Sequence, residues 1–194
     1  MRQDGLVIAG HGRHVVVESA DGARRICHPR GKKSQAVVGD RVWWQASEDE
    51  GTIEAVQERR NLLYRQDEIR TKSFAANLDK VLILMAAEPE FSEVQLTRAL
   101  IAAEAAGIAP LIALNKQDLG AAFERAWARL APYRSMGYTV MPLSLRSDPD
   151  SLAALTQQLQ GQTTLVLGPS GVGKSTLINS LVPDALAATN EISQ

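Results

Sequence analysis

Two short segments of the chain carry residue types that bind a nucleotide. One is a tetrapeptide of the Asn-Lys-x-Asp form, which reads guanine in GTPases. Further along the chain, a glycine-rich segment satisfies the Gly-x4-Gly-Lys-Ser pattern of a phosphate loop. Ordinary GTPases carry the phosphate loop first, so the inverted order predicts a circularly permuted GTP-binding domain. The candidate nucleotide-binding residues are Asn115, Lys116, Gln117 and Asp118, followed by Gly168, Pro169, Ser170, Gly171, Val172, Gly173, Lys174, Ser175 and Thr176.

The phosphate loop predicts a site for GTP or GDP with Mg²⁺. Its glycines allow backbone angles that turn successive N–H groups toward phosphate oxygens, and the helix that follows directs its positive N-terminal end at the same anion. Lys174, the predicted catalytic residue, should contact the β- and γ-phosphates. The Ser175 hydroxyl should ligate Mg²⁺. The alternative is a chance glycine-rich turn.

The tetrapeptide predicts selectivity for guanine over adenine. The Asp118 carboxylate would accept two hydrogen bonds from guanine, and adenine lacks that donor pair. Asn115 would hold the loop and the base edge, while the stem of Lys116 covers the base plane. Ser144 begins a candidate second base-binding loop, whose backbone could contact the guanine oxygen. A plain polar turn is the alternative there.

Four strand–helix pairs are predicted to position these segments. Continuous apolar runs indicate buried parallel strands, and the segments between them show helical spacing. Both nucleotide motifs directly follow strands, at the carboxyl edge where α/β sheets bind ligands. The phosphate-loop strand is expected at an edge of this four-stranded sheet. The predicted strands are residues 81–86, 111–114, 138–143 and 163–167, and the predicted helices are residues 93–106, 121–135, 150–160 and 174–181.

The first third of the chain has a different texture. Short runs rich in β-branched and aromatic residues alternate with turn signals such as Gly39-Asp40, which predicts a small all-β barrel. An oligonucleotide/oligosaccharide-binding (OB) barrel is the natural candidate, and an SH3-like barrel is the alternative. The predicted strands are residues 6–9, 14–18, 24–27, 41–45 and 51–56. The predicted domains are therefore an OB-like barrel over 1–60, a connection over 61–79 and a permuted α/β GTPase domain over 80–194.

Composition narrows the class of protein. The net charge is −1, so no global attraction to nucleic acid or membrane is implied. Cys27 is the single cysteine, which rules out a disulfide within the chain. The start of the chain does not resemble a signal peptide, and no apolar run reaches the ~18–20 residues of a membrane span. We therefore expect a cytoplasmic protein without membrane contact. We also expect a monomer.

One basic segment of the predicted barrel is a candidate RNA contact. It carries five cations and no acidic residue, a composition that suits a phosphate backbone. A solvated charged loop is the alternative. Its members are Arg24, Arg25, Arg30, Lys32 and Lys33.

Taken together, these segments resemble the ribosome small-subunit-dependent GTPase A family (RsgA, also called YjeQ). The resemblance implies a GTPase that acts in late maturation of the small ribosomal subunit, is stimulated by that subunit and turns its barrel toward ribosomal RNA. It also implies one zinc ion in a C-terminal domain whose ligands are not in this chain. The segments that carry the resemblance, besides the two nucleotide motifs, are Gly39-Asp40-Arg41-Val42, residues 60–65, residues 75–81 and residues 189–193.

The family pattern continues past Gln194 with a switch loop, an Asp-x-x-Gly element and the zinc-binding domain. We therefore expect a fragment that binds guanine nucleotide and hydrolyses GTP poorly or not at all. Two other functions stay open. One is a non-catalytic module that binds ribosomal RNA and carries a vestigial nucleotide site. The other is a different P-loop enzyme, an ATPase or a small-molecule kinase.

Overall fold

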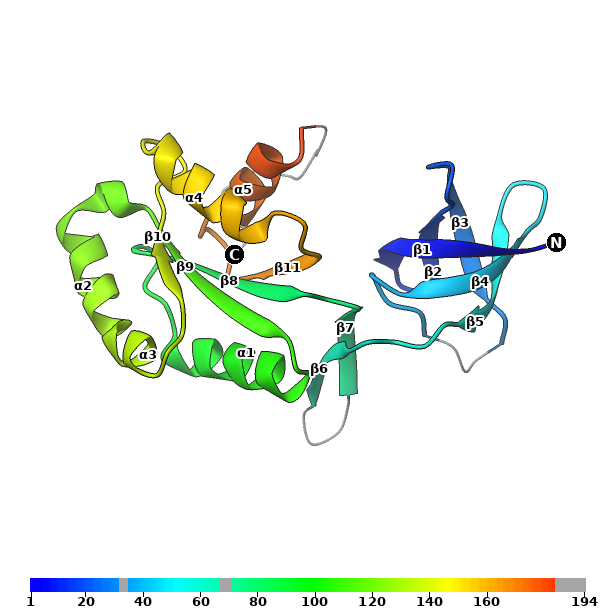
Figure 1. Cartoon of the computed structure of the whole chain (residues 1–194), viewed down its shortest axis with the longest axis horizontal. Helices are drawn as coiled ribbons and strands as arrows, with labels where there is room; N and C mark the ends of the chain where they lie inside the picture. The colour runs from blue at the N-terminus through cyan, green and yellow to red at the C-terminus, as the bar shows by residue number, and fades with distance from the viewer. Residues whose placement is uncertain (32–34, 67–70, 184–194) are drawn as a thin grey trace. The chain divides into compact units, whose positions relative to one another are not determined.

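The computed structural model describes residues 1–31, 35–66 and 71–183, and the chain divides into two compact units, Met1–Leu78 and Asp79–Gln194. Lys32, Lys33 and the segment 189–193 lie outside the described residues. Figure 1 shows a small barrel in the first unit and a sheet flanked by helices in the second.

The first unit contains a closed five-stranded barrel with the strand order β1-β2-β3-β5-β4. Neighbouring strands are antiparallel except β3 and β5, which are parallel, and β4 returns to pair with β1. This Greek-key closure is the OB arrangement, so it confirms the predicted OB-like barrel over the SH3-like alternative. The strands are β1 (Arg2–His11), β2 (His14–Glu18), β3 (Arg24–Pro29), β4 (Arg41–Ala46) and β5 (Gly51–Val56).

Alternating apolar residues fill the barrel interior, as the period of two in a strand requires. Val17, Cys27, Val42 and Ile53 are fully buried and pack in one cluster. Burial raises the pKa of the Cys27 thiol to about 11. The native thiol is therefore both inaccessible and protonated at neutral pH.

Asp40 holds a buried ion pair at the barrel wall. Its side chain is 0% exposed and accepts hydrogen bonds from Arg59 Nε and a terminal guanidinium nitrogen, each at 2.8 Å. The Val37 N–H donates to the same carboxylate at 2.8 Å. The hydrogen bond to Asp40 raises the pKa of Arg59. The Gly39-Asp40 turn thus carries a charge that the fold must keep paired.

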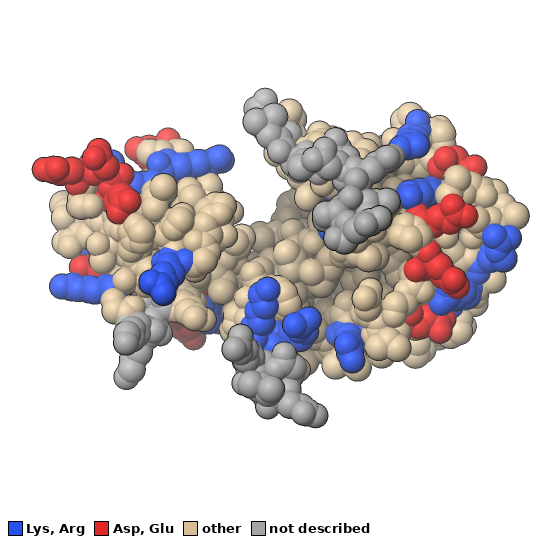
Figure 2. Space-filling model, turned by 180° about the vertical axis from the view of Figure 1, so that it is seen from behind, with Lys and Arg blue, Asp and Glu red and all other residues tan. Residues whose placement is uncertain are grey.

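The segment expected as a plain connection contains a hairpin of β6 (Leu62–Gln66) and β7 (Thr71–Ala76). It belongs to the first unit: Val38 bridges Ala75, and Asn77 Nδ2 donates to the Gly39 carbonyl oxygen at 2.9 Å. Sequence alone did not indicate these strands, because few of their residues are buried and the aromatic Tyr64 and Phe74 are exposed, so that apolar side chains do not alternate with polar ones. Basic side chains gather over the hairpin on the face shown in Figure 2.

The second unit is built on a four-stranded sheet in the order β10-β9-β8-β11, with every pair parallel. The phosphate-loop strand, β11, lies at an edge, as predicted. The strands are β8 (Lys80–Ala86), β9 (Ala109–Asn115), β10 (Val140–Pro142) and β11 (Thr164–Leu167).

Helices cover both faces of this sheet (Figure 1). Leu155 of α4 and Leu177 of α5 pack with Leu82 and Leu84 of β8 in one buried cluster, and α1 lies against the opposite face. The helices are α1 (Glu93–Ala105), α2 (Ala121–Arg129), α3 (Ala131–Ser135), α4 (Pro149–Leu159) and α5 (Lys174–Leu181), with a 3-10 turn, η1 (Gln117–Leu119). No helix within the described residues is long and apolar enough to cross a membrane.

One predicted helix is wrong in detail. The segment 121–135 is split into α2 and α3 at Leu130. Pro132 lies at the start of α3, and proline has no N–H to donate to the preceding turn. The break follows from that missing donor.

We predict that Asp40→Asn destabilises the barrel by about 3 kcal/mol, the lower end for breaking a buried pair, because Arg59 keeps partial contact with water. Cys27 provides the measurement, since a thiol reagent can label it only after the barrel opens. The midpoint of labelling in urea should fall. Glu18→Gln removes the more exposed pair with Arg24 and should cost less than about 1 kcal/mol. Equal midpoints for the two variants would contradict the assignment.

Candidate nucleotide-binding site

The parallel sheet brings the two nucleotide motifs to one edge. Asn115 is the last residue of β9, and Gly168 follows the last residue of β11. β8 lies between these two strands and is parallel to both. The carboxyl ends of parallel strands meet at the same edge, so the chain order of the motifs does not affect their meeting.

Asn115 connects the loops at this edge. Its side chain is 4% exposed; Nδ2 donates to the Val172 carbonyl oxygen at 2.9 Å, and Oδ1 accepts from the Leu145 N–H at 3.2 Å. One buried amide therefore joins the reader tetrapeptide, the phosphate loop and the loop that begins at Ser144.

Two glycines of the phosphate loop are required by close packing. A Cβ on Gly168 would lie 2.3 Å from the Leu84 carbonyl oxygen. Gly173 has φ 102°, and a Cβ there would lie 2.6 Å from Asn115 Nδ2. Only glycine satisfies both positions, and the loop can therefore present its backbone N–H groups to an anion.

Lys174 opens helix α5 directly after the loop. Its ammonium donates to the carbonyl oxygens of Gly168 and Pro169 at 2.5 and 2.7 Å. Burial lowers the pKa of this ammonium, because it disfavours the charged form. A phosphate bound nearby would have the opposite effect and favour the charged form. Ser175 and Thr176 occupy the next positions of the first turn, half-buried and exposed respectively.

This loop fits a magnesium nucleotide by the chemistry of its donors: backbone N–H groups at a helix start, one ammonium and one hydroxyl. Among the described residues, no group of three or more His, Cys, Asp or Glu side chains is arranged to hold a metal ion.

The reader tetrapeptide turns sharply out of the sheet. Lys116 has φ 67°, in the left-handed region, and its Nζ donates to the Glu88 carbonyl oxygen at 2.7 Å. Asp118 follows in η1 with an exposed side chain. Its Oδ1 accepts a hydrogen bond from Ser144 Oγ at 2.9 Å. The Ser144 side chain thus contacts the Asp118 carboxylate directly, a contact that the sequence did not indicate.

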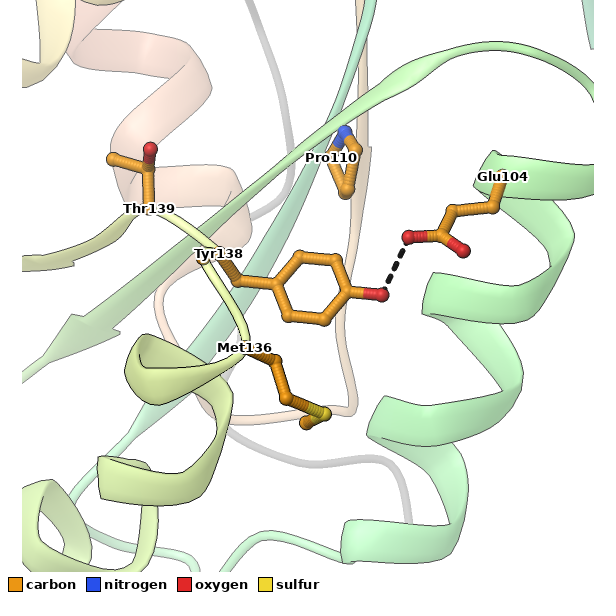
Figure 3. A pocket seen from close by; sticks show the side chains of 6 residues that line it. Glu104, Pro110, Met136, Tyr138 and Thr139 are labelled. Atoms are coloured by element: carbon orange, nitrogen blue, oxygen red, sulfur yellow. Dashed lines mark hydrogen bonds between the residues drawn. The ribbon is translucent and has the colours of Figure 1, made fainter.

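A separate cavity of about 510 Å³ lies elsewhere in the second unit (Figure 3). It is lined by Glu104 of α1, by Pro110 near the start of β9 and by residues 136–139 between α3 and β10. The amino ends of the strands lie opposite the phosphate loop, and the lining contains none of the predicted site residues. Tyr138 donates to Glu104 at 2.5 Å there, and this bond raises the pKa of the Tyr138 hydroxyl. The cavity is therefore distinct from the candidate nucleotide site.

The described arginines of the predicted RNA contact all have acceptors within the barrel. Arg24 pairs with Glu18 at 2.9 Å, Arg25 donates to the Ser47 carbonyl oxygen at 2.7 Å, and Arg30 pairs with Glu54 at 3.4 Å. These pairs are exposed, so they can exchange for phosphate contacts at low cost.

A row of three histidines was not identified from sequence. The ring centroids of His11 and His14 lie 5.5 Å apart, and those of His14 and His28 lie 5.8 Å apart. His28 Nε2 also contacts a Glu50 carboxylate oxygen at 2.9 Å. His11 ends β1, His14 begins β2, and His28 lies in β3. The β1–β2 register pairs His11 with His14, and the fold brings His28 beside them.

Comparison with known proteins identifies the fold and the family. The family model described as RsgA GTPase matches residues 56–194, well over half of the chain. The chain belongs to the RsgA GTPase family. Membership confirms the resemblance drawn from the motifs. The chain is also similar in structure to YjeQ from Thermotoga maritima, with a TM-score of 0.72 and 30% identity over 95% of this chain and 66% of that one.

Two further similarities define how much of the family the chain spans. YloQ, a circularly permuted GTPase, matches with a TM-score of 0.65 and 33% identity over 94% of this chain and 65% of that one. Small ribosomal subunit biogenesis GTPase RsgA of Variovorax paradoxus is 72% identical over 98% of this chain and 60% of its own length. The Paraburkholderia xenovorans protein of the same name is 55% identical over 99% of this chain and 62% of its own. The chain thus spans about three fifths of the curated relatives that it matches.

We predict that Asn115→Ala destabilises the second unit by about 2–4 kcal/mol, because two backbone groups lose their partner at a buried site. Amide hydrogen exchange of β8, β9 and α5 measures the change. Gln117→Ala, an exposed neighbour, is the control and should leave exchange unaltered. Unchanged protection in Asn115→Ala would show that the loops hold together without this amide.

Proposed function

We propose that this chain binds GTP and GDP with Mg²⁺ and that the protein hydrolyses GTP in biogenesis of the small ribosomal subunit. The observation that carries the proposal is the Asn115 amide, which ties the guanine reader to the phosphate loop at one edge of the sheet. The relatives named small ribosomal subunit biogenesis GTPase support the reaction and the partner.

The proposed roles follow from position. Backbone N–H groups of the phosphate loop and Lys174 would hold the phosphates, and Ser175 would ligate Mg²⁺, which neutralises charge on the transferred phosphate. Asp118 would accept the guanine hydrogen bonds, with Ser144 fixing its carboxylate. Lys116, anchored to the Glu88 carbonyl, would lay its stem along the base. An ATPase or a small-molecule kinase is disfavoured, because neither needs this reader.

A titration of the chain with Mg²⁺-GDP and Mg²⁺-ADP tests the site. We expect GDP to bind and ADP to bind at least about 100-fold more weakly, because adenine lacks the donor pair that the Asp118 carboxylate would accept from guanine. Asp118→Asn should lose GDP and gain xanthosine diphosphate, whose oxygen replaces the guanine amine. Asp150→Asn, at an exposed position in α4, should behave as the unaltered chain. Equal affinity for ADP and GDP would refute the guanine site.

The histidine row favours a second candidate, an RNA-binding module. In OB barrels the face of strands 2 and 3, with the loops after strands 1 and 4, binds oligonucleotides. His11, His14 and His28 lie along that face, and Glu50 lies in the loop after β4. Imidazoles can stack on unpaired bases. We propose that ribosomal RNA contacts this face, with Arg24, Arg25 and Arg30 beside it and Lys32 and Lys33 as further candidates.

Affinity for a single-stranded RNA oligonucleotide separates the two functions. His14→Ala should weaken binding about 5-fold or more, as expected for loss of one stacking contact. Lys174→Ala should abolish nucleotide binding. If its RNA affinity equals that of the unaltered chain with and without GTP, the barrel acts as an independent module. If GTP changes RNA affinity and Lys174→Ala removes that change, the two units are coupled and the non-catalytic alternative fails.

A further inference from the structure

A chain of two hydroxyl groups ends on the guanine-reading carboxylate. Ser144 Oγ lies 2.9 Å from Asp118 Oδ1, and Ser147 Oγ lies 2.7 Å from Ser144 Oγ. Each oxygen is within hydrogen-bond distance of the next, although Asp118 and Ser144 are 26 residues apart in the chain. The structure thus links the base reader to the loop that leads into α4.

The direction of these bonds follows from counting protons. A carboxylate can only accept, so Ser144 must donate its one hydroxyl proton to Asp118. Ser144 then has no proton left for Ser147 and can only accept from it. Ser147 is therefore the donor, and the chain runs from Ser147 through Ser144 to Asp118.

Because Ser144 is buried, its hydroxyl oxygen has Ser147 as its available donor. Ser144 is 2% exposed, so bulk water has little access to its oxygen. Its backbone N–H donates to Ser151 Oγ at 3.0 Å, and its carbonyl oxygen accepts from the Asp148 N–H at 3.1 Å. Asp148 in turn caps α4. The start of the helix therefore holds Ser147 beside Ser144.

Asp118 needs such a restraint because its side chain is exposed. A free carboxylate would sample several rotamers and lose that freedom on binding guanine. We propose that Ser147 is a positioning residue for guanine recognition, which aligns the Ser144 hydroxyl and through it the Asp118 carboxylate. The inference rests on the proposed guanine site and extends it to a residue outside the base-binding motifs.

The experiment is a double-mutant cycle on the GDP dissociation constant of the whole chain. Ser147→Ala should weaken GDP binding about 3- to 10-fold, the range for one neutral hydrogen bond. Ser147→Thr, which keeps the hydroxyl, should restore it. In the Ser144→Ala background, Ser147→Ala should have no further effect, because the intermediate hydroxyl is absent. Thr156→Ala, at an exposed position of α4, is the matched control.

The outcomes separate this inference from the proposed function. If the unaltered chain binds no GDP, the proposed site fails. If the unaltered chain binds GDP and Ser147→Ala binds GDP with the same dissociation constant, the positioning role is refuted. Equal losses from Ser147→Ala in the presence and absence of Ser144 would also refute it, since Ser147 would then act by another route. A lower unfolding temperature of free Ser147→Ala, not rescued by Ser147→Thr, would mark a purely structural role.

Discussion

The buried amide of Asn115 is the interaction on which the candidate nucleotide site depends. A side-chain amide has donors on one side and an acceptor on the other, so it can hold two loops that a hydrocarbon side chain could not. Here it donates to the phosphate loop at Val172 and accepts from Leu145. With the residue 4% exposed, water offers little replacement for either bond. One buried side chain therefore makes a hydrogen bond to each of the two loops beside the reader tetrapeptide.

Close packing around that amide explains the glycines. Gly173 lies against Asn115 Nδ2, and Gly168 lies against the Leu84 carbonyl, so side chains at either position would push the loops apart. The phosphate loop is thus shaped from outside by its neighbours as well as by its own backbone angles. Backbone donors that are already in place need no reorganisation when an anion binds.

Circular permutation leaves the site intact for a topological reason. In a parallel sheet all loops at the carboxyl edge are neighbours, whatever order the chain visits them. β11 pairs with β8, and β8 pairs with β9, so the phosphate loop after β11 lies near the reader tetrapeptide at the end of β9.

The barrel unit depends on a different interaction, the Asp40–Arg59 ion pair, whose carboxylate is fully buried.

The sequence by itself determined the elements and the chemistry of the nucleotide motifs. Period-two and continuous apolar patterns report burial directly, so the barrel strands, the four parallel strands and most helices were predictable from local composition. The two motifs predicted a permuted GTPase, because their residue types suit guanine and phosphate binding whatever their order in the chain. The β6–β7 hairpin was not predictable, since its exposed Tyr64 and Phe74 break the apolar alternation. The helical pattern of residues 121–135 is continuous, and it does not show the break between α2 and α3 beside Pro132.

Only the tertiary structure decided which side chains meet. The histidine row depends on strand register, the Asp40–Arg59 pair joins residues 19 apart, and the Ser147–Ser144–Asp118 chain joins two loops. Each includes a contact between residues that are distant in sequence. Apolar periodicity carries no information about such contacts, because it records which positions are buried and not which polar atoms face each other.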